Sequence, residues 1–342
     1  MSKKLGLLNR VIYWINIIAA LFLFVSFIAP YLPPKKFPNL SLLSLAASPL
    51  IVINIFFIGY WSFKLKKLFL LSLPIIVIAY FHFGSFLKFS SNDNPIEMTH
   101  ALNILSFNVR LFNFYESKDA QNNIQETFSS FLEKENPDVL FLQEYNKEMK
   151  IDFPEFPYNY IHFRGKNILG HAIFSKYPLI NTYSFDFEDS YNNALSADLV
   201  KDTDTLRVYN LHLQSLSIKP SVSYLQELNN EVLRKRISTL FIKQQEQVEL
   251  IVEHKNNSRY PVIISGDFNN TPFSYTYRKL SESMNDAFVE AGNGIGTTFL
   301  FEYYPMRIDY ILASKELQIL SFSTINKTFS DHYPISATIA WD

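Results

Sequence analysis

Three long apolar runs dominate the first 92 residues. They cover residues 11–32, 40–63 and 68–87. Each is at or just above the roughly 20 residues that a helix needs to cross about 30 Å of hydrocarbon. Prolines within residues 33–38 and lysines within residues 64–67 separate the runs, and neither a proline nor a charge cluster continues an apolar helix. The pattern predicts a membrane region at residues 1–88 with three transmembrane helices.

A cleaved signal peptide followed by buried core helices is the alternative. The first run is longer than the apolar part of a signal peptide, and no small-x-small cleavage site follows it. Three uncharged runs in succession are also unusual in a soluble core. The membrane interpretation is therefore preferred.

Charge divides the chain at the same place. Residues 1–92 contain nine Lys or Arg and no Asp or Glu, whereas the remainder carries 22 basic and 32 acidic side chains. Six basic residues flank the start of the first run or the end of the second: Lys3, Lys4, Arg10, Lys64, Lys66 and Lys67. Only Lys35 and Lys36 lie between those runs. The positive-inside rule predicts a cytoplasmic N-terminus, and three crossings then place the following domain outside the cytoplasm.

Short apolar segments alternate with helical ones after a polar linker at residues 89–101. Strand-like segments, rich in Val, Ile, Leu and Phe, are residues 102–109, 139–142, 172–175, 206–213, 262–265, 308–313 and 335–340. Residues 120–135 and 225–254 have apolar positions at helical spacing. Several strands are apolar throughout, as expected where both faces of a sheet are covered. Residues 102–342 are thus predicted to form an α/β domain with sheets inside and helices outside.

Composition excludes several classes of protein. The chain has no Cys, so it has no disulfide scaffold, thiolate metal site or cysteine nucleophile. With 48% hydrophobic residues it is not broadly disordered. The part after residue 92 has a net charge of about −10, which disfavours a broad basic surface for a long polyanion, although a local basic patch would suffice.

The most informative polar residues follow a predicted strand. In Gly266-Asp267-Phe268-Asn269, the Asp and the Asn are two positions apart, so their side chains point the same way. The Asp can accept a proton or bind a cation, and the Asn can donate to a phosphate oxygen. A turn closed by Asx hydrogen bonds explains the isolated tetrapeptide about equally well.

The end of the chain supplies a second group. Asp331 and His332 precede the last predicted strand, and Asp309 lies some twenty residues earlier. A carboxylate beside an imidazole fixes its tautomer and raises its basicity, as activation of water requires. Loop polarity, or a surface ion pair between Asp309 and Arg307, would explain each feature alone. Their occurrence together with the Asp267 motif favours one shared site.

Further polar residues lie in or after other strands. Asn108 ends the first strand of the domain, Glu144 follows residues 139–142, and His212 interrupts an apolar strand. Taken singly, Asn108 would cap a turn, Glu144 would face solvent, and His212 would be a hydrogen-bonded core histidine. Weaker candidates for contact with a substrate are His171, Arg164 and Lys166.

In this order, the residues resemble the endonuclease/exonuclease/phosphatase superfamily. That group includes pancreatic-type deoxyribonucleases, exonuclease III-like AP endonucleases, neutral sphingomyelinases and inositol-polyphosphate 5-phosphatases. The residues concerned are Asn108, Glu144, His212, Asp267, Asn269, Asp309, Asp331 and His332. The resemblance covers residues 102–341 and none of the apolar region. It implies an α/β fold class: a four-layer α/β sandwich of two packed mixed sheets flanked by helices, here preceded by three transmembrane helices.

The resemblance also implies a metal site. Glu144 would bind Mg²⁺ or Mn²⁺, with Asn108 and Asp331 beside it, since oxygen donors suit a hard cation. The chain departs from AP endonucleases, which typically have an Asp two residues after the Asn, where this chain has Arg110. The late signatures of 5-phosphatases are also absent.

Catalytic roles are implied in the same way. His332, oriented by Asp309, would activate water or stabilise the phosphate, and Asp267 would position that water. Asn269 would hold a phosphate oxygen, and His212 would stabilise the transition state or protonate the leaving oxygen. Such donors act where charge develops during phosphoryl transfer.

The expected function is that of a membrane-anchored, metal-dependent phosphoesterase. It would hydrolyse a phosphodiester or phosphomonoester, with lipid-linked or small phosphoesters slightly ahead of nucleic acid. The alternatives are an extracytoplasmic nuclease acting on DNA or RNA, and a membrane-bound binding module without turnover. The expected partners are the phosphoester substrate and the lipid bilayer, and no protein partner is inferred.

Overall fold

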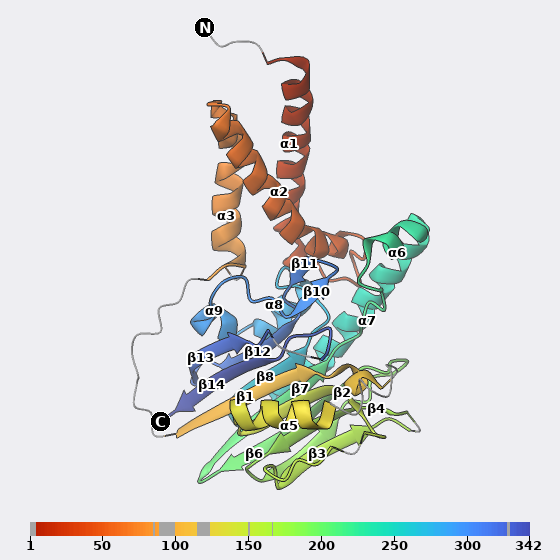
Figure 1. Cartoon of the computed structure of the whole chain (residues 1–342), viewed down its shortest axis with the longest axis vertical. Helices are drawn as coiled ribbons and strands as arrows, with labels where there is room; N and C mark the ends of the chain where they lie inside the picture. The colour runs from red at the N-terminus through yellow and green to blue at the C-terminus, as the bar shows by residue number, and fades with distance from the viewer. Residues whose placement is uncertain are drawn as a thin grey trace.

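An apolar helical bundle stands on one end of an α/β domain (Figure 1). The computed structural model describes residues 5–84, 86–88, 100–114, 124–149, 151–165, 167–326 and 329–342. Lys3, Lys4, Lys166, most of the predicted linker and the start of the helix predicted at residues 120–135 lie outside the described residues.

The bundle contains two helices long and apolar enough to cross a membrane. Helix α1 (Leu7–Ser26) and the 3-10 turn η1 (Ala29–Tyr31) form one segment, and η2 (Leu40–Leu42) with α2 (Leu43–Phe63) forms the other. By length and composition alone, the same test also passes a core helix or a signal sequence.

The third transmembrane helix, predicted at residues 68–87, is shorter in the structure than the sequence pattern predicts. The structure has a 3-10 turn η3 (Lys67–Leu71) and an 11-residue helix α3 (Leu73–Phe83), which is about 17 Å long at 1.5 Å per residue. Pro74 lies in the first turn of α3, where a missing N–H costs nothing, and Gly84 ends the helix with a left-handed φ of 55°. Among the residues before the domain that the structure describes, two helices of spanning length are present, and not the three that were predicted.

Polar side chains join the three segments inside the bundle. The amide Nδ2 of Asn16 donates to the hydroxyl of Ser72 at 2.6 Å, and that hydroxyl donates to Oδ1 of Asn54 at 2.7 Å. The indole of Trp61 donates to Oδ1 of Asn16 at 3.0 Å. All four side chains are fully buried. Because apolar surroundings offer no water, these mutual bonds fix how α1, α2 and α3 pack.

Two mixed six-stranded sheets form the domain, with strand orders β13-β14-β1-β2-β4-β3 and β5-β6-β7-β8-β12-β9. Their strands are β1 (His100–Asn108), β2 (Val139–Asn146), β3 (Tyr158–Phe163), β4 (Leu169–Ser175), β5 (Leu179–Ser184), β6 (Asn193–Lys201), β7 (Asp204–His212), β8 (Val262–Asp267), β9 (Met284–Asp286), β12 (Asp309–Ser314), β13 (Gln318–Thr324) and β14 (Ile335–Trp341). A separate hairpin pairs β10 (Phe299–Phe301) with β11 (Tyr304–Met306). All seven predicted strands are present, within a few residues of the expected bounds.

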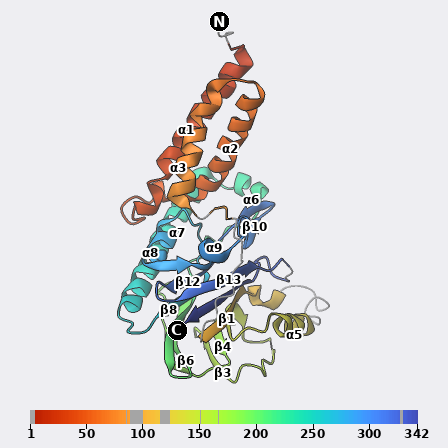
Figure 2. The same ribbon diagram turned by 90° about the vertical axis from the view of Figure 1, so that its left-hand side faces the viewer.

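Helices cover the outer faces of both sheets (Figure 2). They are α5 (Ile124–Glu135) on the first sheet and α7 (Asn230–Asn256), α8 (Tyr275–Ser281) and α9 (Ala287–Ala291) around the second. The short α6 (Val222–Glu227) lies near the bundle before α7, and a short η4 (Arg110–Asn113) follows β1 (Figure 1). The predicted helix at residues 225–254 is thus divided between α6 and α7, with a new start at α7 capped by the side chain of Asn229.

The core between the sheets draws on both of them. Ile104 of β1, Val208 of β7, Ile263 of β8 and Ile311 of β12 are fully buried in one cluster. Separate clusters pack α5 on the first sheet and α7 and α8 on the second. The arrangement of helix, sheet, sheet and helix confirms the predicted four-layer α/β sandwich.

Specific contacts join the bundle to the domain. They are Lys35–Glu249, Ser44–Thr271, Ser48–Tyr304, Tyr31–Arg278 and Phe83–Phe273. These contacts place the start of α2 beside the β10–β11 hairpin (Figure 1).

Candidate active site

Strand register explains how residues distant in the sequence meet. Asp267, the last residue of β8, is paired with His212 at the end of parallel β7 and with Asp309 at the start of antiparallel β12. Asn108 ends β1 of the other sheet, beside β2, which carries Glu144. The carboxyl ends of the central strands of both sheets therefore meet, as ligand sites of parallel strands commonly do.

Asp267 is at the centre of this group. Its Oδ2 accepts hydrogen bonds from the amides of Asn108 at 3.1 Å and Asn269 at 3.2 Å, and its Oδ1 accepts from the backbone N–H of Asn269 at 2.7 Å. The same Oδ2 lies 3.7 Å from Nε2 of both His212 and His332. Burial raises the pKa of Asp267, and the positive charge of His332 opposes that rise.

His332 and Asp309 form a carboxylate–imidazole pair. Nδ1 of His332 is 3.0 Å and 3.2 Å from the two carboxylate oxygens of Asp309, and both side chains are buried. Burial alone would lower the pKa of His332, but the carboxylates of Asp309 and Asp267 raise it. The imidazolium form is therefore favoured, with Nε2 directed toward Asp267.

His212 is backed by a second histidine. Nδ1 of His212 is 3.2 Å from Nε2 of His171, and both rings are nearly fully buried. Burial, the neighbouring His171 and His332 lower the pKa of His212, and burial is also the main cause that lowers the pKa of His171 to about 3. Both rings are neutral at pH 7, so one nitrogen of the pair donates to the other. His171 thus lies behind the site and holds His212.

Glu144 reaches the site because the strand bends. Its φ is +53°, and the pairing of β2 with β4 shifts register between Leu142 and Tyr145. Bulges and left-handed non-glycine residues commonly turn a side chain toward a functional cleft. Oε1 of Glu144 lies 3.4 Å from Nδ2 of Asn108 and 3.7 Å from Nε2 of His212. Burial raises the pKa of this carboxyl.

Arg110 is the residue that sequence reasoning missed. It follows Asn108 with a φ of +46°, and its Nε lies 3.8 Å from Oδ2 of Asp331. Both side chains line the central cavity. A basic residue two positions after the strand-terminal Asn108, near an otherwise acidic group, is the signal that could have indicated it. Arg164 does not reach this site, because its guanidinium donates to the carbonyls of Phe187 and Ser190.

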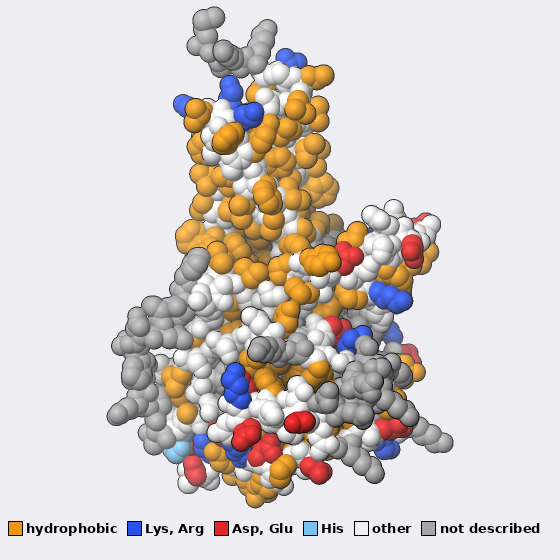
Figure 3. Space-filling model, in the orientation of Figure 1, with side chains coloured by type: hydrophobic (Ala, Val, Ile, Leu, Met, Phe, Trp, Pro, Cys, Tyr) orange, Lys and Arg blue, Asp and Glu red, His pale blue; other side chains and the backbone are white. Residues whose placement is uncertain are grey.

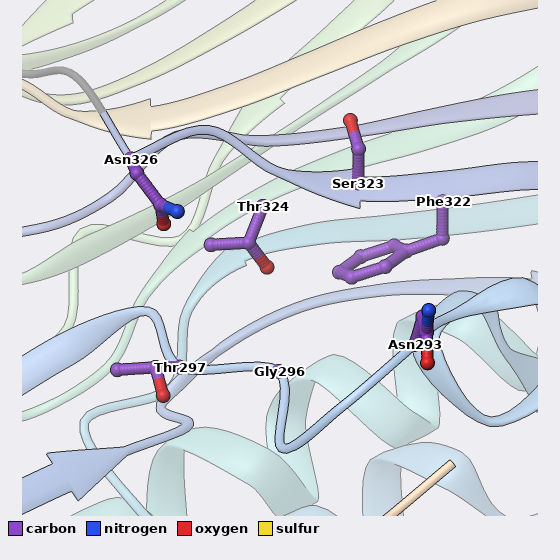
Figure 4. A pocket seen from close by; sticks show the side chains of 7 residues that line it. All are labelled: Asn293, Gly296, Thr297, Phe322, Ser323, Thr324 and Asn326. Atoms are coloured by element: carbon purple, nitrogen blue, oxygen red, sulfur yellow. The ribbon is translucent and has the colours of Figure 1, made fainter. Parts of the chain in front are cut away.

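A cavity of about 1230 Å³ opens above these residues. The site residues that line it are Arg110, Glu144, His212, Asp267, Asn269, Asp331 and His332. A smaller hollow of about 330 Å³ lies between residues 293–297 and the end of β13 (Figure 4). No titratable side chain occurs among the described residues that line the smaller hollow. The chemistry therefore belongs to the larger cavity.

The donor set fits a divalent cation. Ligand atoms of Asp267, Asp309 and His332 all lie within 4.8 Å of one another, but Asp309 directs both oxygens at His332. The carboxylates of Glu144 and Asp331 line the cavity beside them and suit a hard cation. Asn108 presents its NH₂ group to Glu144 and Asp267, while its oxygen accepts the N–H of Arg110. In this orientation Asn108 positions the carboxylates.

Comparisons with known proteins agree with this geometry. The model of the Endonuclease/Exonuclease/phosphatase family matches residues 105–332, about two thirds of the chain. A domain of unknown function (DUF8431) matches residues 9–86. A search of the curated proteins returns no match.

Solved structures share the fold. The endonuclease/exonuclease/phosphatase family protein from Bacteroides thetaiotaomicron aligns with a TM-score of 0.56 and 19% identity over 72% of this chain and 100% of that one. The endonuclease/exonuclease/phosphatase from Bacteroides vulgatus aligns with a TM-score of 0.54 and 19% identity, over 71% of this chain and 100% of that one. D. rerio TDP2, complexed with a single strand DNA product, aligns with a TM-score of 0.54 and 16% identity, over 70% of this chain and 98% of that one. The solved structures show the fold alone, whereas the family match over residues 105–332 shows that this chain belongs to the endonuclease/exonuclease/phosphatase family and is a phosphoester-hydrolysing enzyme.

Proposed function

We propose that this chain is a membrane-anchored phosphoesterase that uses Mg²⁺ or Mn²⁺ to hydrolyse a phosphodiester or phosphomonoester by attack of water. Lipid-linked or small phosphoesters are its favoured substrates. The observation that carries the proposal is the convergence of Glu144, Asp267 and His332 on one cavity, from both sheets and from the loop before β14.

The carboxylates of Glu144 and Asp331 would hold the cation, and the amide of Asn108 orients Glu144 at 3.4 Å. When bound, the cation supplies Lewis-acid polarisation of the phosphate and neutralises charge that develops on it. Arg110 lies beside Asp331, where its guanidinium can bind a phosphate oxygen.

Side chains of the protein would accept and donate the protons of the reaction. The pKa of Asp267 is raised by burial, so its carboxylate can accept a proton from the attacking water. His332 is held as an imidazolium by Asp309 and can stabilise the phosphate through Nε2. Neutral His212 is suited to stabilise or protonate the leaving oxygen, and Asn269 to hold a phosphate oxygen.

The proposed location is the outer face of a membrane. The start of α1, which carries Arg10, and the end of α2, which Lys64 and Lys66 follow, lie at the end of the bundle remote from the sheets (Figure 1), and Lys or Arg side chains gather at that end (Figure 3). Lys35, in contrast, pairs with Glu249 on the domain side. The positive-inside rule favours a cytoplasmic basic end and an extracytoplasmic catalytic domain.

The proposed division of the chain is a membrane region at residues 1–88, a linker at residues 89–101 and a catalytic domain at residues 102–342. The two family matches, to residues 9–86 and 105–332, support this division.

Nucleic acid is the second candidate substrate, because the similar structure of D. rerio TDP2 is complexed with a single strand DNA product. The test is a panel of bis(4-nitrophenyl) phosphate, 4-nitrophenyl phosphate and plasmid DNA, assayed with the full chain in detergent. Mg²⁺-dependent release of nitrophenol that the His332→Ala variant abolishes supports the first candidate. Plasmid nicking without release of nitrophenol favours nucleic acid. No turnover on the whole panel would overturn the proposed function.

A further inference from the structure

The cavity above the active site has two unlike parts. One end carries the catalytic side chains, and the remaining walls are mostly apolar. Helix α2, residues 215–225 and the β10–β11 hairpin contribute to the apolar walls, together with residues of α7 and Phe86, Leu87, Phe273 and Ile295. Residues 215–225 contribute Leu216 and Ile218, which are partly exposed. The cavity therefore extends well beyond the space that a phosphate group needs.

Helix α2 supplies one wall from the bundle. Ile51, Val52 and Ile55 line the cavity, and these residues lie on one face because positions three or four apart in a helix are neighbours. Val52 is 41% and Ile55 49% exposed, so the protein leaves much of their apolar surface uncovered. The same helix is long and apolar enough to cross a membrane. The apolar wall is thus continuous with the proposed membrane region.

The hairpin connects that wall to the catalytic centre. Phe299 forms a β-bridge with His332, and the two rings are 5.0 Å apart. At the other end of the hairpin, the hydroxyl of Tyr304 is 2.8 Å from that of Ser48 on α2. Phe301 lines the cavity between these two contacts. The hairpin therefore places the apolar side chains of Phe299 and Phe301 on the cavity wall between the imidazole of His332 and α2.

The charges in the cavity argue against a nucleic-acid groove. Among the described residues, the Lys and Arg side chains that line it are Arg110 and Arg307. Arg110 lies beside Asp331, and Arg307 is buried against Asp286 at 2.7 Å. Single-stranded nucleic acid requires a positively charged groove along its backbone. A hydrocarbon chain, in contrast, would remove the exposed apolar walls from water.

We infer that the substrate is an amphiphilic phosphoester, whose phosphate lies at Asp267 and His332 and whose hydrocarbon chain lies between α2 and the β10–β11 hairpin. The inference rests on the proposed function and deepens it, because it makes a membrane helix part of the substrate site. The volume of about 1230 Å³ exceeds the roughly 300–1,000 Å³ of ordinary ligand sites, as a long chain requires.

The test measures how kcat/KM depends on chain length. Ethyl, octyl and hexadecyl esters of phosphate and of 4-nitrophenyl phosphate are assayed with the full chain and Mg²⁺, in mixed micelles of fixed composition. Because the micelle already removes the long chain from water, only a preference of the cavity over the micelle counts, and kcat/KM for the hexadecyl ester should exceed that for the ethyl ester by about tenfold or more.

Two matched pairs of substitutions locate the effect. Val52→Asn with Ile55→Asn alters the cavity wall, whereas Ile53→Asn with Phe56→Asn alters exposed positions of α2 outside it. The first pair should lower the hexadecyl-to-ethyl ratio about tenfold, and the second should leave it unchanged. Phe301→Ser, in the hairpin, tests the other wall and should also lower the ratio.

The outcomes separate the inference from the function on which it rests. Hydrolysis of the ethyl esters without dependence on chain length, or an equal fall in the ratio for both pairs, overturns the inference and leaves the phosphoesterase proposal standing. Faster cleavage of plasmid DNA than of any ester also overturns it. If none of the phosphoesters is hydrolysed, the proposed function fails and the inference fails with it.

Discussion

At the scale of single residues, the site depends on carboxylates with different partners. Asp309 gives both oxygens to His332, Asp267 is shared between two amides and two imidazoles, and Glu144 is turned into the cavity by a left-handed backbone. Because each carboxylate has different neighbours, substitution of each should have a different kinetic effect.

Asp309→Asn should lower kcat by about 10²–10⁴-fold with little change in the Mg²⁺ requirement. The amide cannot hold His332 as an imidazolium, so the charge facing the phosphate is lost. Steady-state kinetics on 4-nitrophenyl esters measure the effect, and Asp189→Asn, at an exposed position, is the control. Native kcat in the Asp309 variant would show that the pair does not act in catalysis.

Glu144→Gln should instead raise the Mg²⁺ concentration needed for half-maximal activity by about tenfold or more, because a neutral amide binds a hard cation weakly. Chelation by EDTA should abolish activity in the native chain, and added Mg²⁺ or Mn²⁺ should restore it. Glu148→Gln, exposed four residues later, is the matched control. An unchanged Mg²⁺ titration would remove Glu144 from the proposed metal site.

At the scale of elements, the register of β7, β8 and β12 brings His212, Asp267 and Asp309 together. Gly266 allows this close approach: its φ is +132°, and a Cβ there would lie 2.0 Å from the carbonyl oxygen of Leu211 in β7. Gly266→Ala should therefore lower the free energy of unfolding by about 3 kcal/mol or more. Thermal unfolding measures it, with Gly59→Ala, which meets no neighbouring atom, as the control. Equal melting temperatures would contradict the packing argument.

The bundle makes a separate prediction. Asn16→Leu removes the partner of both Ser72 and Trp61 and should destabilise the bundle by about 1–2 kcal/mol. The substitution Ile15→Leu, at an exposed neighbour, should cost little. Unfolding in increasing fractions of SDS distinguishes them, and identical curves would show that the polar contacts do not hold the three segments together.

Much of the element pattern was predictable from the sequence, because apolar strands bounded by turn residues leave a clear local signal. The meeting of Asp267, Asp309 and His332 was predictable for the same reason, since Asp267 and Asp309 lie at strand ends and His332 lies in the loop before β14. The length of the third apolar helix was not, because Pro74 could interrupt a helix or begin one, and here it begins one. The pairing of His171 with His212 depends on packing between distant segments, which no local pattern records, whereas Arg110, two positions after Asn108, left a local signal that the sequence interpretation did not use.

At the scale of the whole molecule, the apolar bundle and the catalytic domain share one cavity. The contacts of Ser44 with Thr271 and of Ser48 with Tyr304 hold the start of α2 against the domain. Phosphate chemistry and an apolar wall therefore adjoin each other, although they come from opposite ends of the chain. The order of the apolar region and the α/β domain along the sequence did not predict that helix α2 contacts the domain.

The orientation proposed for the membrane is testable because the chain has no Cys. A single Cys at Ser323, on β13 of the catalytic domain, should react with a membrane-impermeant maleimide on intact cells, whereas a Cys at Lys66 should react only after lysis. Labelling in the opposite order would reverse the orientation.

The central claim is that the residues around Asp267 hydrolyse a phosphoester. The most direct measurement is Mg²⁺-dependent release of nitrophenol from bis(4-nitrophenyl) phosphate and 4-nitrophenyl phosphate by the full chain and by its Asp267→Asn variant. The account predicts turnover by the native chain on at least one of the two esters, and a loss of about 10³-fold or more in the variant. Equal turnover by both proteins, or none by the native chain, would contradict it.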